Sequence, residues 1–397
     1  MAERRIRLLF AGTTFVLGGA ERVLSHLIRG LARPPFDVHL LALREPGAIG
    51  EELRAAGIPV TSRLTGEGKV DLGLLPRLRA FLLRERFDAI YFLDHAHAVF
   101  YLTLASLGTG VRARVMPVHT TRQWGGARSL KRPIRLVLPK LDRVIAIAEA
   151  QRRYLIEEEG VPPGQLEVIP NGIPLRDRGE DRGALRAAAR AEFGTAPDAP
   201  VVGITAVLRP EKNHELLLAA FARLRAAEPA AELWLIGDGP RRAALEAEAV
   251  RLGLGLSARF LGSRSDARRL MAGLDLACLS SHPAVETLPL SLLEAMDADL
   301  PVVATRVGAL DEMVEEGRSG ILVEAGDVEG FAEALCRLIS DARLRGGRGG
   351  GGGGGGARTE GRRLGRASGR KRIAGVAPGG GRAAGRGPTQ LGGLISG

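Results

Sequence analysis

The sequence contains little cysteine and no long apolar run. Only two of its 397 residues are cysteines, Cys278 and Cys336, and both lie within apolar stretches. Reduced thiols in a protein core are typical of a cytosolic protein rather than of a disulfide-rich secreted domain. No apolar run reaches the roughly 18 residues that a membrane-spanning helix requires. We therefore expect a cytoplasmic protein without a transmembrane helix.

A signal peptide is the alternative interpretation of the N-terminus. Arg4 and Arg5 precede the apolar stretch 8–17, a pattern that a short signal peptide also shows. The segment is better explained as a buried parallel strand over 6–11, followed by a loop and a helix that opens at 18–21. We therefore expect it to be part of the fold.

Most of the chain has no net charge. The net charge is +11, but residues 342–397 carry 12 Lys and Arg against one acid, Glu360, so residues 1–341 hold 44 basic and 44 acidic residues. A neutral globular part without a basic face studded with aromatic residues argues against nucleic-acid binding. An RNA-binding protein that acts through its Arg/Gly-rich tail is the rival interpretation.

Several cofactor motifs are also missing. The sequence has no G-x4-G-K-[ST] phosphate loop. His95 and His97 have the spacing of a metal pair, but no set of Cys, His or carboxylate partners accompanies them, which favours a polar cleft lining. Asp297 and Asp299 imitate a D-x-D metal site, yet they end a helix rather than a strand, which favours helix capping. We expect no metal and no cofactor.

The C-terminal tail lacks the composition of a folded segment. Gly349–Gly356 is a run of eight glycines, and Arg, Gly and Ala dominate to the end. Such a segment cannot bury enough apolar surface to offset its ordering entropy, so we expect 345–397 to be disordered. We interpret it as translation in a shifted frame of a GC-rich gene, or as a sequencing error with that effect. Inspection of the DNA tests this, since the other frame should encode an amphipathic helix.

Short apolar runs alternate with amphipathic helical patterns along the rest of the chain. This alternation predicts α/β domains with doubly wound parallel sheets. The predicted strands are 6–11, 36–43, 58–62, 88–93, 112–118, 143–147, 166–169, 201–206, 233–236, 257–260, 275–279 and 301–304. The predicted helices are 72–86, 98–107, 149–159, 213–227, 289–298 and 327–340.

The stretch 280–305 contains two carboxylates eight positions apart, Glu286 and Glu294. Pro289 suits the first position of the predicted helix between them. Glu286 then lies on the loop before the helix, and Glu294 lies about 7 Å along its axis. The helix N-terminus between the two carboxylates is a favourable seat for phosphate, which suggests a nucleotide sugar as ligand.

This stretch resembles the E-x7-E motif of the retaining glycosyltransferases of family 4, the group 1 glycosyltransferases, which have the GT-B fold. In that family the first Glu contacts the donor sugar and the second contacts the ribose. The pattern around Glu286, Pro289 and Glu294 carries the resemblance, and the strand at 301–304 completes it. One difference is Asp299, which stands where the family usually has Gly at the end of the helix. Asp substitutes in part, because it tolerates positive φ better than most residues.

Further motifs extend the resemblance over residues 1–341. Residues 18–22 read G-G-A-E-R, and in the family such glycines lie beside the donor phosphates and sugar. His119 follows a predicted strand, as does a family histidine that lies against the donor sugar. Residues 169–172 and 237–240 match I-P-N-G and G-D-G-P, the latter expected mainly as a turn. Lys212 matches the Lys of R-x4-K, whereas Arg209 is a weaker match because Val207 stands at the usual Arg position.

The resemblance implies a GT-B architecture, with two Rossmann-like domains facing across a cleft. We expect an acceptor domain over 1–175, a donor domain over 176–344 that begins with a linker at 176–184, and the disordered tail over 345–397. In relatives a C-terminal helix braces the first domain. That helix is absent here, so an inactive GT-B protein is a third interpretation.

The implied activity is metal-independent transfer of a sugar from a nucleotide sugar to a saccharide or a lipid-linked acceptor, with retention of configuration. The expected catalytic residues are His119 and Glu286. The expected donor-binding residues are Gly18, Gly19, Arg209, Lys212, Leu288, Pro289, Leu290 and Glu294.

The segment 122–140 mixes Arg and Lys with Trp124 and with apolar residues at 136–138. Relatives dock on membranes through basic amphipathic elements in this half of the chain. Contact with the inner face of a membrane and a solvated helix face are both open for this segment.

Overall fold

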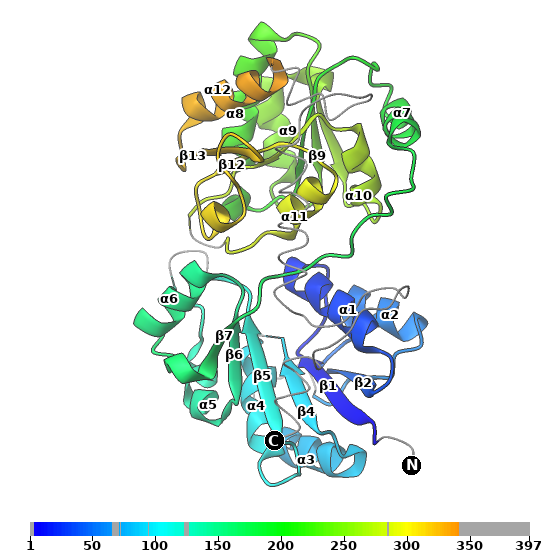
Figure 1. The fold of residues 1–397 in the computed structure, drawn as a ribbon, viewed down its shortest axis with the longest axis vertical. Coiled ribbons are helices and arrows are strands. Elements are labelled where there is room, and N and C mark those ends of the chain that lie inside the picture. Colours follow the sequence, from blue (N-terminus) through cyan, green and yellow to red (C-terminus); the bar gives the residue numbers. More distant parts are fainter. Residues whose placement is uncertain are drawn as a thin grey trace, which may run out of the picture. The chain divides into compact units, whose positions relative to one another are not determined.

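A computed structural model describes residues 4–65, 71, 73–93, 95–122, 127–283 and 286–340. The chain divides between Asn171 and Gly172 into two compact units, which Figure 1 shows and which are described separately below. The tail predicted to be disordered lies outside the described residues, as does Trp124. Among the described residues, no helix has the length and hydropathy to span a membrane.

The N-terminal unit contains a sheet of seven strands. Its strands are β1 (Ile6–Gly12), β2 (Phe36–Ala42), β3 (Val60–Thr61), β4 (Ala89–Phe92), β5 (Ala113–Val118), β6 (Arg143–Ala146) and β7 (Leu166–Val168). Its α-helices are α1 (Gly19–Leu31), α2 (Gly47–Ala55), α3 (Leu74–Glu85), α4 (Ala96–Ser106), α5 (Arg132–Val137) and α6 (Glu149–Glu157), and its 3₁₀ turns are Leu138–Lys140 and Pro163–Gln165.

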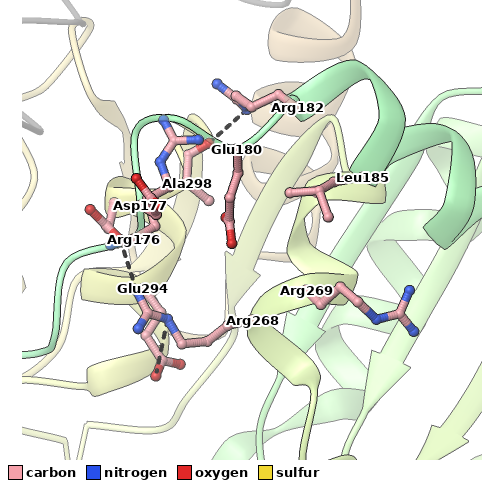
Figure 2. Close-up of a pocket in the computed structure, with 11 residues that line it drawn as sticks. Arg176, Asp177, Glu180, Arg182, Leu185, Arg268, Arg269, Glu294 and Ala298 are labelled. Carbon is pink, nitrogen blue, oxygen red and sulfur yellow. Dashed lines mark hydrogen bonds and ion pairs between the residues drawn. The ribbon is translucent and has the colours of Figure 1, made fainter.

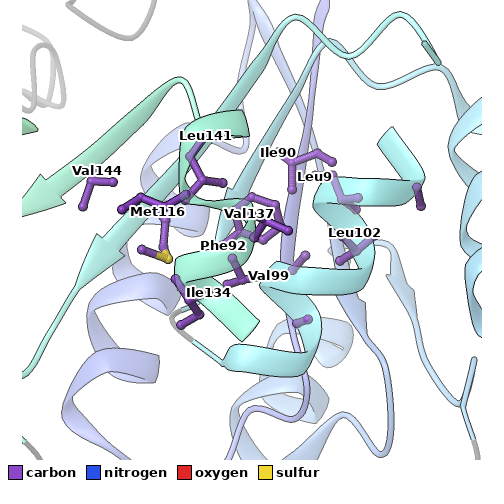
Figure 3. Close-up of a cluster of buried hydrophobic side chains, with 14 of the residues drawn as sticks. Leu9, Ile90, Phe92, Val99, Leu102, Met116, Ile134, Val137, Leu141 and Val144 are labelled. Atoms are coloured by element: carbon purple, nitrogen blue, oxygen red, sulfur yellow. The ribbon is translucent and has the colours of Figure 1, made fainter. Parts of the chain in front are cut away.

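Alternating side chains of β1 face the two sides of this parallel sheet, whose order is β3-β2-β1-β4-β5-β6-β7. Leu8 and Phe10 pack with α1 and α2 on one side, whereas Leu9 and Ala11 pack with α3, α4 and α5 on the other. Figure 3 shows the second cluster, in which Leu9, Phe92 and Met116 of the strands meet helix residues. Burial on both sides explains why the strands are apolar runs without polar alternation.

The C-terminal unit contains a sheet of six strands. Its strands are β8 (Val201–Thr205), β9 (Glu232–Ile236), β10 (Ala258–Gly262), β11 (Leu276–Leu279), β12 (Val302–Thr305) and β13 (Gly320–Val323). Its α-helices are α7 (Arg182–Glu192), α8 (His214–Ala227), α9 (Arg242–Arg251), α10 (Ala267–Leu270), α11 (Leu290–Asp297) and α12 (Val328–Ser340), and its 3₁₀ turns are Pro210–Lys212, Gly255–Ser257, Met271–Gly273 and Leu310–Glu312.

The order of this parallel sheet is β10-β9-β8-β11-β12-β13. One side is covered by α8, α9 and α12, whose apolar residues pack on strand side chains such as Val202, Leu235 and Val303. Cys278 belongs to this cluster and is buried, and burial raises the pKa of its thiol well above the ordinary value. Both cysteines are free thiols, as predicted. Each unit is thus a Rossmann-like domain, which confirms the predicted fold class.

The prediction misses two elements and misplaces the end of the linker. No helix is predicted between the second and third strands, where the structure has α2. No strand is predicted after 301–304, where the structure has β13. The predicted linker 176–184 is also too long, because α7 begins at Arg182, with the Asp181 side chain accepting from the N–H groups of Gly183 and Ala184. This N-cap hydrogen bonding makes Asp181 a helix start rather than a linker residue.

Candidate functional site

The C-terminal sheet reverses its winding direction between β8 and β11, which are neighbours although β9 and β10 lie between them in sequence. Ligands of open parallel sheets bind beyond the carboxyl ends of the strands at such a switch point. The loop after β8 carries Lys212, and the loop after β11 carries Glu286. Two residues that are 74 positions apart in sequence therefore meet at the switch point.

Lys212 and Glu286 form an ion pair in this place, since the Lys212 ammonium contacts Oε1 of Glu286. The same oxygen accepts from the Ser281 hydroxyl at 2.7 Å. The side chain of Glu286 is 8% exposed and that of Lys212 is 22% exposed. A carboxylate this buried requires compensation, and here an ammonium and a hydroxyl provide it.

Neighbouring backbone groups fix this pair. The Ser280 hydroxyl donates to the carbonyl oxygen of Lys212 at 2.9 Å, which joins the two loops. Gly308 has a φ of 60°, and a Cβ there would lie 2.2 Å from the carbonyl oxygen of Glu286. No other residue fits this position without displacing the loop, so Gly308 maintains the placement of Glu286.

Helix α11 starts one residue later than predicted. Pro289 is its N-cap, with extended backbone angles of φ −71° and ψ 128°, and not the first helical residue. Leu288 is buried at 8% exposure, so it anchors the start of the helix. The first turn of α11 follows the Glu286 loop directly, as the sequence analysis expects.

Glu294 lies on α11 and points toward a pocket of about 350 Å³ (Figure 2). Its side chain is 16% exposed, and its Oε1 lies 4.0 Å from Nε of Arg268 on α10. The other lining residues come from α7, α10, the 3₁₀ turn after α10, the end of α11 and the segment before α7: Arg176, Asp177, Glu180, Arg182, Leu185, Arg269, Ala272, Asp297 and Ala298. This volume is within the range of small-molecule sites.

Asp297 and Asp299 at the end of α11 bind arginines. Asp297, whose side chain is 2% exposed, accepts from Arg268 and from the backbone N–H of Arg176, both at 2.8 Å. Asp299 accepts from Arg182 at 3.1 Å and also pairs with Arg176. Asp299 has the left-handed φ of 55° that its place after the helix predicts. The capping interpretation is thus right for Asp299 but wrong for Asp297, which is an ion-pair partner.

Arg209 and the 237–240 turn flank the Lys212 loop. The Arg209 side chain is 57% exposed and lies 3.8 Å from Glu211. A Cβ at Gly237 would lie 1.9 Å from the carbonyl oxygen of Ala206, and one at Gly239 would lie 2.6 Å from that of Leu208. The two glycines therefore let this turn pack against the loop, which confirms the structural interpretation of the motif.

The N-terminal sheet has its own switch point, between β1 and β4. The N–H of Thr13 donates to Nδ1 of His95 at 3.0 Å, so the ring proton lies on Nε2, which is 3.9 Å from Oε1 of the buried Glu21. Gly18 is the N-cap of α1 with extended backbone, and a Cβ on Gly19 would meet no atom within 4 Å. The open space at Gly19 leaves the start of α1 accessible to a ligand. The sequence analysis assigns no role to Glu21, whose contact with His95 arises only in the fold.

His119 directly follows β5 and is partly buried. In the segment 122–140, the structure describes 122 and 127–140. Val137 and Leu138 are buried there, whereas Leu136 is 66% exposed. Two of the three apolar residues at 136–138 therefore belong to the protein core, as Figure 3 shows for Val137. Membrane contact through this segment stays a prediction that rests on Leu136 and the basic residues.

The His95–His97 pair acquires no further ligands in the described part of the chain, where no group of three or more His, Cys, Asp or Glu side chains is placed to hold a metal ion. The His97 ring packs edge-on against Tyr101 instead. It lines a small pocket with Thr13, Arg44 and Asp71.

Two family models match the chain. Residues 17–177 match the model described as "Glycosyltransferase Family 4", and residues 199–341 match the model described as "Glycosyl transferases group 1". The second match covers Lys212, Glu286 and Glu294.

Named proteins are similar to parts of the chain. A lipopolysaccharide core biosynthesis glycosyltransferase, LpsE of Rhizobium meliloti, is 36% identical over 41% of this chain and 46% of its own length. An N-acetyl-alpha-D-glucosaminyl L-malate synthase of Bacillus anthracis is 29% identical over 69% of this chain and 71% of its own. The chain spans about half the length of the first of these relatives.

Solved structures give the widest coverage. The crystal structure of Anabaena Alr3699/HepE in complex with UDP and glucose superposes with a TM-score of 0.76 and 25% identity, over 92% of this chain and 95% of that one. WaaG, a glycosyltransferase involved in lipopolysaccharide biosynthesis, superposes with a TM-score of 0.66 at 17% identity, which concerns the fold alone. With two Rossmann-like units and family matches in both, the chain belongs to the GT-B glycosyltransferases.

Proposed function

We propose that this protein transfers a sugar from a nucleotide sugar to a hydroxyl of a saccharide or lipid-linked acceptor, with retention of configuration and without a metal ion. The observation that carries the proposal is the Lys212–Glu286 ion pair at the switch point of the C-terminal sheet, directly before the first turn of α11. The similarity to HepE, whose structure holds UDP and glucose, supports a nucleotide-sugar donor.

The ion pair suits a charged donor because its partners can be exchanged. A diphosphate that approaches Lys212 replaces the Glu286 carboxylate as the partner of the ammonium. Glu286 is then free to accept hydrogen bonds from the sugar hydroxyls, while Ser281 continues to orient it. Without a ligand the two charges of the pair compensate each other, and in the proposed complex the diphosphate compensates the ammonium instead.

The leaving diphosphate requires positive charge as the glycosidic bond breaks. In the proposed reaction Lys212 supplies it as a point charge, the N-terminus of α11 at 288–290 supplies N–H groups and dipole, and Arg209 approaches from the solvent side. These fixed groups take the role that a divalent ion has in other transferases. Glu294 binds the ribose hydroxyls.

The N-terminal unit contributes Gly18, Gly19 and His119 in this proposal, on the basis of the family motifs. The accessible start of α1 at Gly19 is consistent with a ligand close to the backbone. The name of LpsE, a lipopolysaccharide core enzyme, supports a saccharide or lipid-linked acceptor.

The direct test is a screen of UDP-, GDP- and ADP-sugars for slow hydrolysis and for a rise in melting temperature. At least one donor should be hydrolysed and should stabilise the protein. The sugar released or transferred should keep its anomeric configuration, which proton NMR measures on fresh product. Inversion would contradict the retaining mechanism, and no binding of any donor would contradict the proposed function.

Two carboxylate variants separate the assigned roles. Glu294→Ala should weaken nucleotide affinity by about 1.5–3 kcal/mol, because it removes a carboxylate that accepts from the ribose. Glu286→Ala should mainly lower turnover, since its ligand is the sugar. Calorimetric titration with the nucleotide product compares the two. Equal and unchanged affinities would remove both assignments.

A further inference from the structure

Arg268 lies on α10 beside Glu294, the residue that we propose binds the ribose. Its Nε lies 4.0 Å from Oε1 of Glu294, and its Nη2 donates to Oδ2 of Asp297 at 2.8 Å. Glu294 and Asp297 are three positions apart on α11, so their side chains leave the same face of the helix. A single guanidinium therefore spans both carboxylates.

The two contacts of Arg268 differ in strength. Asp297 is almost completely buried and also accepts from the backbone N–H of Arg176 at 2.8 Å and from Arg178 at 3.4 Å. It is a fixed anchor, because a buried carboxylate with several donors has no room to move. The contact to Glu294 is longer, so Arg268 orients that carboxylate without holding it as tightly as Asp297.

We propose that Arg268 is a positioning residue: anchored by Asp297, it holds the Glu294 carboxylate oriented toward the nucleotide's ribose. This inference rests on the proposed function, because it assumes that Glu294 binds a nucleotide. Figure 2 shows the Arg268 side chain beside Glu294, whereas Arg269 extends from the other side of the pocket. Arg269 pairs with Asp266 and Glu192 instead.

The test is calorimetric titration of the full chain with UDP, with GDP and with inorganic pyrophosphate. Arg268→Gln should weaken the nucleoside diphosphate that the wild type binds by roughly three- to tenfold, the size of one partly exposed charged contact. Pyrophosphate has no ribose, so its affinity should not change. Arg264→Gln is the control, because Arg264 pairs with Asp266 and Glu192 but does not line the pocket, and it should leave these affinities unchanged.

A double variant separates positioning from a general loss of structure. In a Glu294→Gln background, Arg268→Gln should cause no further loss of nucleotide affinity, because its effect passes through Glu294. A further loss there, an equal loss for pyrophosphate, or no loss in the single variant would overturn the inference while leaving the proposed function intact. If Arg268→Gln fails to fold, Arg268→Lys keeps a charge for Asp297 and should show the same nucleotide-specific loss. If the wild type binds neither UDP nor GDP, the same titrations are made with ADP, and binding of none of the three nucleotides would overturn the proposed function and this inference with it.

Discussion

The switch points of the two sheets carry different chemistry. At the end of β1 and β4, a neutral imidazole accepts from a backbone N–H and faces the carboxylate of Glu21. At the end of β8 and β11, an ammonium and a carboxylate neutralise each other in a partly buried pair. The first arrangement suits hydroxyl groups, and the second can exchange an internal ion pair for a charged ligand. The same topology therefore carries an uncharged hydrogen-bonding group in one unit and an ion pair in the other.

The C-terminal unit also contains a buried ion pair outside the proposed site. The largest expected effect comes from breaking this structural pair, in contrast to the Lys212–Glu286 pair. Arg190 and Asp275 pair at 2.8 Å with both side chains 3% exposed, and Arg190 also donates to the carbonyl oxygens of Gly273, Ala196, Pro197 and Ala199. Burial lowers the pKa of Arg190 to about 10.

Arg190→Ala should lower the free energy of unfolding by about 3–5 kcal/mol, because it removes four hydrogen bonds to backbone carbonyl oxygens and one cation of the buried Asp275 carboxylate, which then keeps Arg186 at 3.0 Å. Urea denaturation measures the change. Arg241→Ala, which breaks the exposed pair with Glu215, is the control and should cost at most about 1 kcal/mol. Similar losses in both variants would contradict the structural role of Arg190.

Breaking the Lys212–Glu286 pair should affect activity more than stability. Lys212→Ala should reduce sugar transfer by roughly 100- to 1000-fold, because the leaving diphosphate loses its main positive charge. Its free energy of unfolding should fall by less than that of Arg190→Ala, because the Lys212 side chain is 22% exposed and the Ser281 hydroxyl still donates to Glu286. Initial rates and melting temperatures give both numbers. Arg209→Ala is the matched control, and this exposed side chain should cost only a few-fold in rate.

The two units also differ in the hydrogen bonding of a histidine. His95 of the N-terminal unit accepts a hydrogen bond, whereas His214 of the C-terminal unit makes none. His214 on α8 is fully buried, neither ring nitrogen has a hydrogen-bond partner, and burial lowers its pKa to about 4 from the ordinary 6.5. The unfolded chain therefore binds a proton more readily than the folded protein. The stability that this difference contributes is fully present above pH 6.5 and is lost as the pH falls toward 4.

His214→Leu should remove this part of the acid sensitivity, which amounts to up to about 3 kcal/mol between pH 7 and pH 4. Urea denaturation of both proteins at pH 7 and pH 4.5 measures it. His39, whose pKa burial also lowers, remains in the variant, so part of the pH dependence should persist. An unchanged slope would show that His214 does not titrate between folded and unfolded states.

The smallest expected effect concerns metal ions. If the fixed cations of the C-terminal unit carry the diphosphate charge, activity should persist in EDTA, with no more than a small change in rate. Loss of turnover in the chelator, restored by Mn²⁺ or Mg²⁺, would contradict the proposed metal-independent mechanism. It would direct attention to Asp297 and Asp299, although arginines now occupy both.

The sequence predicts those parts of this molecule that depend on local patterns. Apolar runs that are buried on both sides identify β1, β4 and β8, and the positive φ of Asp299 follows from its place after a helix. It misses α2, which is a short helix with three buried residues, Ile49, Gly50 and Leu53. A pattern of three buried positions is too short to stand out from a loop.

The contacts of the candidate site are the part that the sequence does not predict. Arg176 and Asp297 are 121 positions apart, and Lys212 and Glu286 are 74 apart. The sequence analysis names Lys212 and Glu286 separately, as ligands of phosphate and sugar, because their pairing depends on the order of β8 and β11. Asp297 is misassigned for the same reason, since its arginine partners come from α10 and the segment before α7.

The lysine of the ion pair at the switch point also allows the site to be labelled selectively with a reagent for amines. Lys212 is the only lysine between residues 172 and 340, where positive charge otherwise comes from arginine. Guanidinium groups do not react with mild acylating reagents, whereas an amine does. One acetylated peptide in a digest therefore reports on Lys212, and its protection by a donor would measure occupancy without any knowledge of the acceptor.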